Sequence, residues 1–280
     1  MSGSPQDTPT TEQVTGWWAT AISDISPGVI RLRGYPIQQL IQHASFADVI
    51  WLLLRGELPS PRQSALLETA MVAAVDHGPQ APSIAAARMA ATCGVGLNSA
   101  VATGVGLLGD VHGGAGQQCM EILTGIRDRV DSTGTPIADA VGDHLAELRA
   151  AGRYVPGFGH RFHPRDPRRD PLMAALTDGV RNGVVAGAFQ EIGLEIERQL
   201  AAGRPRPVPM NIDGATAIIY SELGFAPDLG RGLFVLSRAV GVLAHAWEEK
   251  EQGRRIKGPI PPPLLPTYRG AGTRDVPTGR

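Results

Sequence analysis

The sequence predicts a mostly α-helical fold with one short β-hairpin near the N-terminus. Apolar residues recur at helical spacing from about residue 37 to residue 251, and capping residues mark where the segments begin and end. The only convincing β signal is the alternation of Ile30 and Leu32 with Arg31 and Arg33, which we expect to point outward. Apart from this hairpin, we expect the chain to be almost wholly helical.

The helices can be placed from their starting and ending residues. Pro36 opens a short first helix, and Ser45 with Asp48 three positions later forms a capping pattern for a helix over residues 46–55. Gly56 suits the left-handed position that closes that helix. The same reasoning predicts further helices over residues 61–74, 83–93, 97–108, 115–126, 137–148, 171–181, 188–200, 211–223 and 228–251.

Three of these helices, and the segment after the last one, have a distinctive composition or pattern. Residues 83–108 are rich in Ala and Gly, which lets two helices pack with their backbones close together, and Gly94 and Gly96 mark the break between them. In the last helix apolar residues follow one stripe, and Arg238 lies off it. That stripe contains Leu229, Leu233, Leu236, Val240, Leu243 and Trp247. The proline-rich residues 259–266 then predict an extended arm.

Composition excludes several classes of protein. The 280 residues carry a net charge of -1, so nothing attracts the chain as a whole to nucleic acid or to an anionic membrane. Cys93 and Cys119 have no C-x-x-C partner, which argues against a disulfide framework and favours the reducing cytoplasm. The start has no signal-peptide pattern, and the apolar run 49–54 is too short to span a bilayer. We expect residues 1–16 to be a disordered tail and residues 271–280 a flexible one.

The segment 154–168, YVPGFGHRFHPRDPR, concentrates the most unusual chemistry of the chain. Gly157 and Gly159 let a ligand approach the backbone closely, and three prolines stiffen the loop. Imidazole and guanidinium groups on a stiff loop suit an anionic carbonyl compound, because Arg matches a carboxylate as a planar fork. The alternative is a solvated connection that carries surface charges.

Four places in the sequence share one pattern, a titratable side chain beside glycine at a loop or helix end. They are Asp76-His77-Gly78, His112-Gly113-Gly114, Gly159-His160-Arg161 and Asn211-Ile212-Asp213-Gly214. Three imidazoles and a carboxylate on separate elements can converge on one cleft, together with Arg168 and Arg238. Taken singly, a His at a helix end more often has a structural role. No pair of His shows the spacing of a helix-borne zinc motif, so we expect no metal site.

Five segments resemble the successive signatures of the citrate synthase superfamily, in the family's order over about residues 17–270. They are ISDISPGVIRLRGYPIQQL, GDVHGGAGQQ, VPGFGHRFHPRDPR, NIDGATAIIYSELG and LFVLSRAVGVLAHAWEE. The resemblance implies a two-lobe helical fold, with a small lobe at about residues 153–235, and usually a homodimer. It also implies activity on a coenzyme A thioester and an oxo acid, with no tightly bound cofactor.

The resemblance assigns roles to individual residues. Asp213 resembles the base that takes a methyl proton from acetyl-CoA, His112 the donor to the thioester oxygen, and His160 the partner of the oxaloacetate carbonyl. The residues that match ligands of the oxaloacetate or citrate carboxylates are His77, Arg168 and Arg238, with Arg161 as an addition. The backbone that matches the coenzyme A loop belongs to Val155, Pro156, Gly157, Phe158 and Gly159. Such chemistry needs a carboxylate base and a fixed donor at the developing oxyanion.

The chain also departs from full-length citrate synthases. It is considerably shorter, and Gly258 stands where the family usually has an Arg that reaches the partner subunit's substrate; Arg254, Arg255 or Lys257 could replace it. The short form, with its DHGP and GHR motifs, is more similar to citryl-CoA lyase and to the lyase module of ATP-citrate lyase. We therefore predict cleavage of citryl-CoA to acetyl-CoA and oxaloacetate. The alternatives are a citrate synthase that uses acetyl-CoA or a longer acyl-CoA, and a non-catalytic subunit that binds citrate or coenzyme A.

Overall fold

The computed structural model describes residues 10–160, 163–206, 208–258, 260–261 and 263–276. Within these ranges it has twelve helices and one small antiparallel sheet, which confirms the predicted mostly α-helical fold. The chain divides into two compact units, Met1–Ala73 with Ala115–Gly230, and Ala74–Gly114 with Arg231–Arg280. Most of the predicted small lobe belongs to the first unit, and its boundaries stay a prediction.

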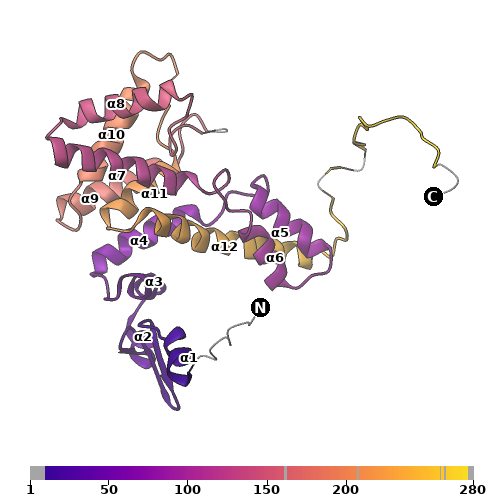
Figure 1. Ribbon diagram of the computed structural model, residues 1–280, viewed down its shortest axis with the longest axis horizontal. Coiled ribbons are helices and arrows are strands. Elements are labelled where there is room, and N and C mark those ends of the chain that lie inside the picture. Colours follow the sequence, from indigo (N-terminus) through magenta and orange to yellow (C-terminus); the bar gives the residue numbers. More distant parts are fainter. Residues whose placement is uncertain (1–9, 161–162, 207, 259, 262, 277–280) are drawn as a thin grey trace, which may run out of the picture. The chain divides into compact units, whose positions relative to one another are not determined.

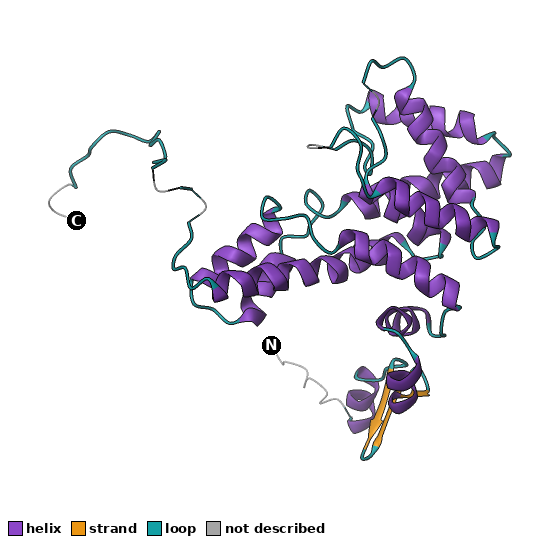
Figure 2. Ribbon diagram, turned by 180° about the vertical axis from the view of Figure 1, so that it is seen from behind, coloured by secondary structure: helices purple, strands orange, loops and turns teal. Residues whose placement is uncertain are grey.

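The N-terminal sheet is one strand larger than the predicted hairpin (Figure 2). Its strands, which pair antiparallel in chain order, are β1 (Ser23–Ser26), β2 (Val29–Leu32) and β3 (Tyr35–Pro36). The prediction that Arg33 points outward is wrong, because Arg33 and Gly34 both have positive φ and form the turn into β3. This turn directs the Arg33 guanidinium to the carbonyl oxygen of Leu53, at 2.8 Å. Ile30 is 43% exposed and pairs with Ile25, which is 70% exposed.

The predicted capping signals act as expected in the first unit. The Ser45 hydroxyl accepts from the Asp48 N–H at 3.1 Å, the Asp48 carboxylate accepts from the Ser45 N–H at 2.7 Å, and Gly56 closes the helix at φ 94°. The helices of this unit before residue 75 are α1 (Thr11–Trp17), α2 (Ile37–His43), α3 (Phe46–Arg55) and most of α4 (Pro61–Ala74). We did not expect α1, since residues 11–16 were assigned to a disordered tail; a capping box of Thr10 and Gln13 begins it.

Five helices of the first unit pack together in one bundle (Figure 1). They are α7 (Ala115–Thr133), α8 (Ile137–Ala150), α9 (Arg169–Arg181), α10 (Ala188–Ala201) and α11 (Ile212–Glu222). Helix α11 packs against α7, α9 and α10, and α8 packs against α7 and α10. Residues 214–221 of α11 are all buried. The N-terminal turn of α11 is therefore held by its neighbours, and this turn carries Asp213.

The second unit confirms the close packing expected from small residues. It consists of α5 (Pro82–Thr92), α6 (Leu97–Val105) and most of α12 (Pro227–Glu251). A Cβ added to Gly104 of α6 would lie 2.7 Å from the carbonyl oxygen of Ser83 in α5 and 2.7 Å from Val242 of α12. The predicted break between α5 and α6 is also present, with Gly94 at φ 86°.

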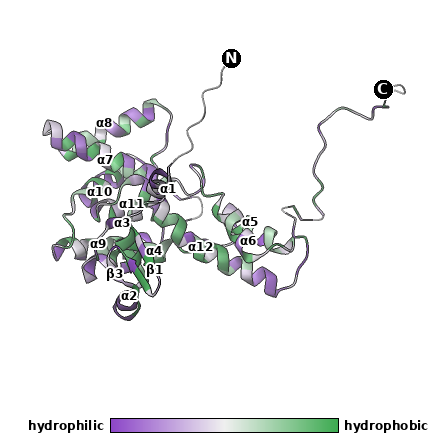
Figure 3. Cartoon of the chain, turned by 60° about the horizontal axis from the view of Figure 1, so that its bottom comes forward, coloured by the Kyte–Doolittle hydropathy of each residue, from purple (hydrophilic) through white to green (hydrophobic). Residues whose placement is uncertain are grey.

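Helix α12 buries only the beginning of its predicted apolar stripe. Leu233 of the stripe is buried, but Leu236, Val240, Leu243 and Trp247 are 45–58% exposed. Beyond Leu233 the buried residues include Ser237, Arg238, Val242, Ala246 and Glu249. Apolar and polar residues are both spread along this helix (Figure 3). By length and composition α12 is the one described helix that could cross a membrane, a test that core helices of soluble proteins also meet.

The chain after α12 is fastened to α5 by two backbone contacts. The N–H of Ile256 donates to the Thr92 carbonyl oxygen at 3.2 Å, and the N–H of Lys257 donates to the Thr92 hydroxyl at 2.9 Å. Pro259 and Pro262 of the predicted proline-rich arm lie outside the described residues. The described apolar residues of the arm, such as Leu264 and Leu265, are exposed.

Candidate active site

The predicted site residues fall into two groups, one in each unit. The first unit contains Val155, Pro156, Gly157, Phe158, Gly159, His160, Arg168 and Asp213, and the second contains His77, His112 and Arg238. Arg161 lies outside the described residues.

Asn211 joins the predicted coenzyme A loop to the helix that carries Asp213. Its side-chain oxygen caps α11, accepting from the N–H groups of Asp213 at 2.9 Å and Gly214 at 3.3 Å. Its amide nitrogen donates to the carbonyl oxygen of Gly159 at 2.6 Å, and its backbone N–H donates to that of Gly157 at 3.0 Å. The loop and the base are therefore fixed by one side chain. The sequence showed Asn211 in its motif but gave no sign of this second role.

Gly157 is required by the fold itself. It has φ 83°, and a Cβ there would lie 2.7 Å from the Cα of Gly214 and 3.0 Å from the sulfur of Cys119. We expected Gly157 to let a ligand approach the backbone; in the structure it lets the start of α11 pack closely against the loop. Phe158 is buried and forms a β-bridge with Met210. Binding of coenzyme A to the backbone of residues 155–159 stays a prediction.

His160 is held as a neutral hydrogen-bond donor. The backbone N–H of His163 donates to Nδ1 of His160 at 3.0 Å, so Nδ1 carries a lone pair and the ring proton resides on Nε2. Burial lowers the pKa of His160, and the neighbouring His163 and Arg168 lower it further, against the opposing charge of Asp166. At neutral pH this ring can therefore present an Nε2–H group to an oxygen atom without being charged.

Asp166 is a site residue that sequence reasoning missed. Its carboxylate is 1% exposed and accepts from the Arg168 side chain twice, at 2.9 Å from Nε and 2.9 Å from an Nη atom. It also accepts from the backbone N–H of Ile212 at 3.0 Å, one residue before Asp213. Burial raises the pKa of Asp166, but these hydrogen bonds outweigh it and bring the pKa to about 2. One carboxylate therefore orients Arg168 and fixes the first turn of α11.

Asp213 lies half-buried in the first turn of α11, where the partial positive charge of a helix N-terminus favours a carboxylate. Its charge also affects the nearby Cys119. Burial, with Asp213 as the second cause, raises the pKa of the Cys119 thiol to about 12. The thiol is therefore protonated at neutral pH and is not a nucleophile.

His112 of the second unit is also fixed in one neutral form. Ser83, in the first turn of α5, donates its backbone N–H to Nε2 of His112 at 3.2 Å, and its hydroxyl lies 3.0 Å from the same nitrogen. The ring proton therefore resides on Nδ1. Burial lowers the pKa of His112, and the charge of Arg238 lowers it further. Ser83 is fully buried, and its role was not predicted, because Ser at a helix start usually caps its own helix.

The side chain of Arg238 binds the backbone of the segment before His77. The Nε of Arg238 donates to the carbonyl oxygen of Ala74 at 3.0 Å, and its guanidinium lies 4.9 Å from the centre of the Phe234 ring. Arg238 is only 4% exposed. Burial of a guanidinium next to a loop that bears imidazole is consistent with the anion-binding role expected of both residues.

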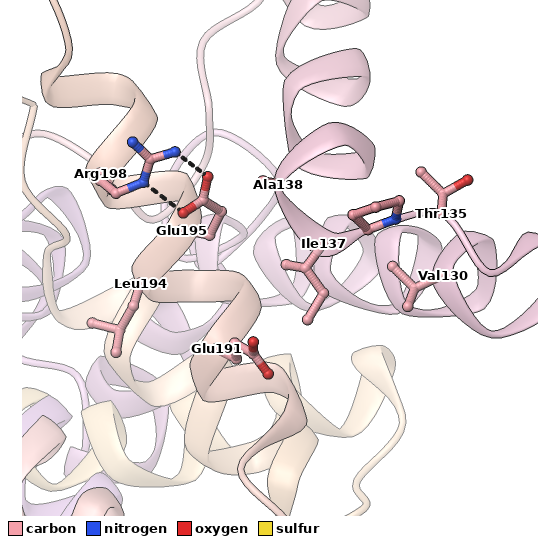
Figure 4. A pocket seen from close by; sticks show the side chains of 9 residues that line it. Val130, Thr135, Ile137, Ala138, Glu191, Leu194, Glu195 and Arg198 are labelled. Carbon is pink, nitrogen blue, oxygen red and sulfur yellow. Dashed lines mark hydrogen bonds and ion pairs between the residues drawn. The ribbon is translucent and has the colours of Figure 1, made fainter.

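The first unit also contains a hollow of about 620 Å³ between α10 and the start of α8 (Figure 4). None of its lining residues is a predicted site residue, and of its three charged lining residues, Glu191, Glu195 and Arg198, the last two pair with each other at 2.6 Å. Within the described ranges, no three His, Cys, Asp or Glu side chains are grouped closely enough to hold a metal ion.

Sequence comparison finds one family over almost the whole chain. The model of the citrate synthase C-terminal domain matches residues 13–65 and 59–259. Citrate synthase of Haloferax volcanii is 30% identical over 226 residues, which are 80% of this chain and 54% of that protein. Citrate synthase of Acidithiobacillus ferridurans is 28% identical over 74% of this chain and 52% of its own. The chain thus spans about half the length of the curated relatives that it matches.

Structural comparison confirms the predicted fold. Citryl-CoA lyase from Hydrogenobacter thermophilus superposes with a TM-score of 0.80 at 32% identity, over 93% of this chain and 97% of that one. ATP citrate lyase from Methanothrix soehngenii, solved with citrate and coenzyme A, shares the fold with a TM-score of 0.76 at 21% identity, over 94% and 42%. On the family match and on these structures, the chain belongs to the citrate synthase family.

Proposed function

We propose that this protein is an enzyme that cleaves citryl-CoA reversibly to acetyl-CoA and oxaloacetate. The observation that carries the proposal is the extent of the match to the Hydrogenobacter citryl-CoA lyase, 93% of this chain and 97% of that one. The synthase relatives are about twice as long as the region that they share with this chain. Coenzyme A enters as part of the thioester substrate, with no tightly bound cofactor.

The proposed chemistry uses the two neutral imidazoles as donors. In the condensing direction Asp213 takes a proton from the methyl group of acetyl-CoA, and the Nδ1–H of His112 stabilises the negative charge that develops on the thioester oxygen. The Nε2–H of His160 donates to the carbonyl oxygen of oxaloacetate as that oxygen becomes a hydroxyl. Cleavage retraces these steps, and the protonated Asp213 returns the proton to the methyl carbon.

The proposed carboxylate ligands are Arg168, Arg238 and His77. Asp166 holds Nε and one Nη of Arg168, which directs the second Nη away from Asp166. A guanidinium held in this way loses little side-chain entropy when it binds a carboxylate. The Ala74 carbonyl holds Nε of Arg238 in a similar manner. Fixed cations of this kind suit the carboxylates of citrate or oxaloacetate.

Citrate synthase remains the second candidate, because the curated relatives are named citrate synthase. Direct chemistry distinguishes the two. Purified protein is mixed with citryl-CoA, and the products are separated over time, with heat-denatured protein as the control for spontaneous hydrolysis. We expect acetyl-CoA and oxaloacetate in equal amounts. Citrate with free coenzyme A would instead identify a synthase, because that enzyme hydrolyses the thioester.

We propose further that the enzyme is a homodimer. The exposed apolar stripe of Leu236, Val240, Leu243 and Trp247 supports this, since a monomer gains nothing from a continuous apolar face in water. Light scattering coupled to gel filtration should give twice the chain mass of 29.5 kDa. Leu243→Glu should lower that mass, because it places a charge in the middle of the stripe. A monomeric mass for the unmodified chain would contradict the proposal.

A further inference from the structure

We propose that His245 is a positioning residue, which sets the place of His77 by holding Asp76 against α12. This inference rests on the proposed function, in which His77 binds a carboxylate of the four-carbon oxo acid. His245 itself does not contact substrate in this proposal. Its effect passes through the short segment that leads from α4 to the first turn before α5.

That segment is attached to α12 at three successive places. Arg238 donates to the Ala74 carbonyl at 3.0 Å, the Gly241 N–H donates to the Val75 carbonyl at 3.1 Å, and Nε2 of His245 lies 3.3 Å from the Asp76 carboxylate. The first two attachments use backbone oxygen atoms and leave the direction of the next side chains open. Only the third contact fixes a side chain, and that side chain belongs to the residue directly before His77.

Asp76 connects this contact to the turn that follows His77. Its carboxylate accepts from the N–H of Gly78 at 3.1 Å, and Gly78 has φ 74°. Burial raises the pKa of Asp76, but the Gly78 N–H and His245 outweigh it, so the pKa is lowered and the group is charged at neutral pH. The Asp76 carboxylate thus closes a turn around His77 by binding the Gly78 N–H, and His245 holds that carboxylate in place.

The contacts of His245 determine which of its nitrogens carries the proton. Nδ1 lies 3.0 Å from an Nη atom of Arg88, and a guanidinium can only donate, so Nδ1 must accept. The proton is therefore on Nε2, where it can be donated to Asp76. His245 thus forms a bridge between Arg88 of α5 and the Asp76 carboxylate.

Arg88 is itself fixed by a buried ion pair. Its guanidinium is 2.5 Å from Glu249, whose side chain is fully buried, and it also pairs with Glu248, which lies 4.0 Å from Nδ1 of His245. Glu249 is bound in addition by Lys257 at 2.7 Å. These pairs hold the Arg88 guanidinium beside His245. The ring of His245 therefore has one favourable orientation, as a residue that positions another must.

The test measures the affinity of the protein for oxaloacetate by titration calorimetry. His245→Leu removes both hydrogen bonds at similar size and should weaken binding about tenfold, the scale of one lost charged hydrogen bond. His245→Gln, whose amide has one donor and one acceptor, should bind within about threefold of the unmodified protein. The matched control is His43→Leu, which replaces an exposed His of the first unit and should change nothing. In turnover, His245→Leu should raise KM for the four-carbon acid and leave kcat within about twofold.

A double-mutant cycle tests the route through Asp76. Asp76→Asn should weaken oxaloacetate binding, and the double variant with His245→Leu should bind no more weakly than the poorer single variant, because both changes break one contact. Additive effects would overturn the inference, as would unchanged binding in a folded His245→Leu protein. Failure of the unmodified protein to bind oxaloacetate would instead overturn the proposed function. Imidazole nitrogen NMR gives a result independent of substrate: a His245 proton on Nδ1 at neutral pH would also contradict the inference.

Discussion

Asp213→Asn should abolish the exchange of solvent deuterium into the methyl group of acetyl-CoA, measured by mass spectrometry with oxaloacetate present. The amide keeps the size of the side chain and its place in the first turn of α11, but it cannot accept a proton from carbon. Loss of a general base of this kind lowers the rate by about a hundredfold to ten-thousandfold. We expect cleavage of citryl-CoA to fall by a similar factor, because the same carboxyl group returns the proton.

Asp178→Asn is the matched control for this experiment. Asp178 is an exposed carboxylate of α9, in the same unit, and has no part in the proposed mechanism. Exchange at the unmodified rate in Asp213→Asn would remove Asp213 from the mechanism. Absence of exchange in the unmodified protein with every acyl-CoA tried would favour the third possibility, a subunit that binds citrate or coenzyme A without catalysis.

Asp166→Asn should destabilise the protein and weaken its binding of oxaloacetate together. An amide at this position would place an N–H₂ group against either the Arg168 guanidinium or the Ile212 N–H, both of which are donors. A buried ion pair broken from one side costs about 3 kcal/mol, since the remaining charge is left without a partner. We expect a loss of about that size in the free energy of unfolding, measured with urea, and at least about tenfold weaker oxaloacetate binding.

Asp170→Asn is the control, because Asp170 is exposed and pairs with the exposed Arg165 and with Arg169. Such pairs contribute about 1 kcal/mol or less. The pH dependence adds a second check. Folding lowers the pKa of Asp166 from 3.8 to about 2, so its stabilising effect is present above about pH 4 and is lost as the pH falls toward 2. The difference between the unmodified protein and Asp166→Asn should shrink over that range; a constant difference would contradict the assignment.

Local sequence signals placed the helices well. The Ser45–Asp48 capping box, the left-handed Gly56 and the glycine break between α5 and α6 all act through residues a few positions apart. Such contacts form whatever the rest of the chain does, so a sequence states them directly. Helix α1 was missed although Thr10 and Gln13 carry the same signal, because the polar composition around them suggested disorder.

Burial was harder to predict. The periodicity of α12 correctly grouped Leu236, Val240, Leu243 and Trp247 on one face, yet that face is exposed. Periodicity says which residues share a face, and only the packing of α5 and α6 decides which face is covered. On the buried side Ala246 packs with small residues of α5 and α6, and Gly241 lets the Val75 backbone approach closely.

The sequence by itself determined the family of this protein, the order of its helices and the identity of the candidate groups His112, His160 and Asp213. The tertiary structure alone decided how those groups are prepared for chemistry. Asp166 meets the Ile212 N–H across 46 positions of the chain, and Ser83 meets His112 across 29. A proton's place on an imidazole and the charge of a buried carboxyl depend on which donors surround them. Those donors belong to segments that are distant in the sequence, and only the folded chain brings them close to the groups that they bind.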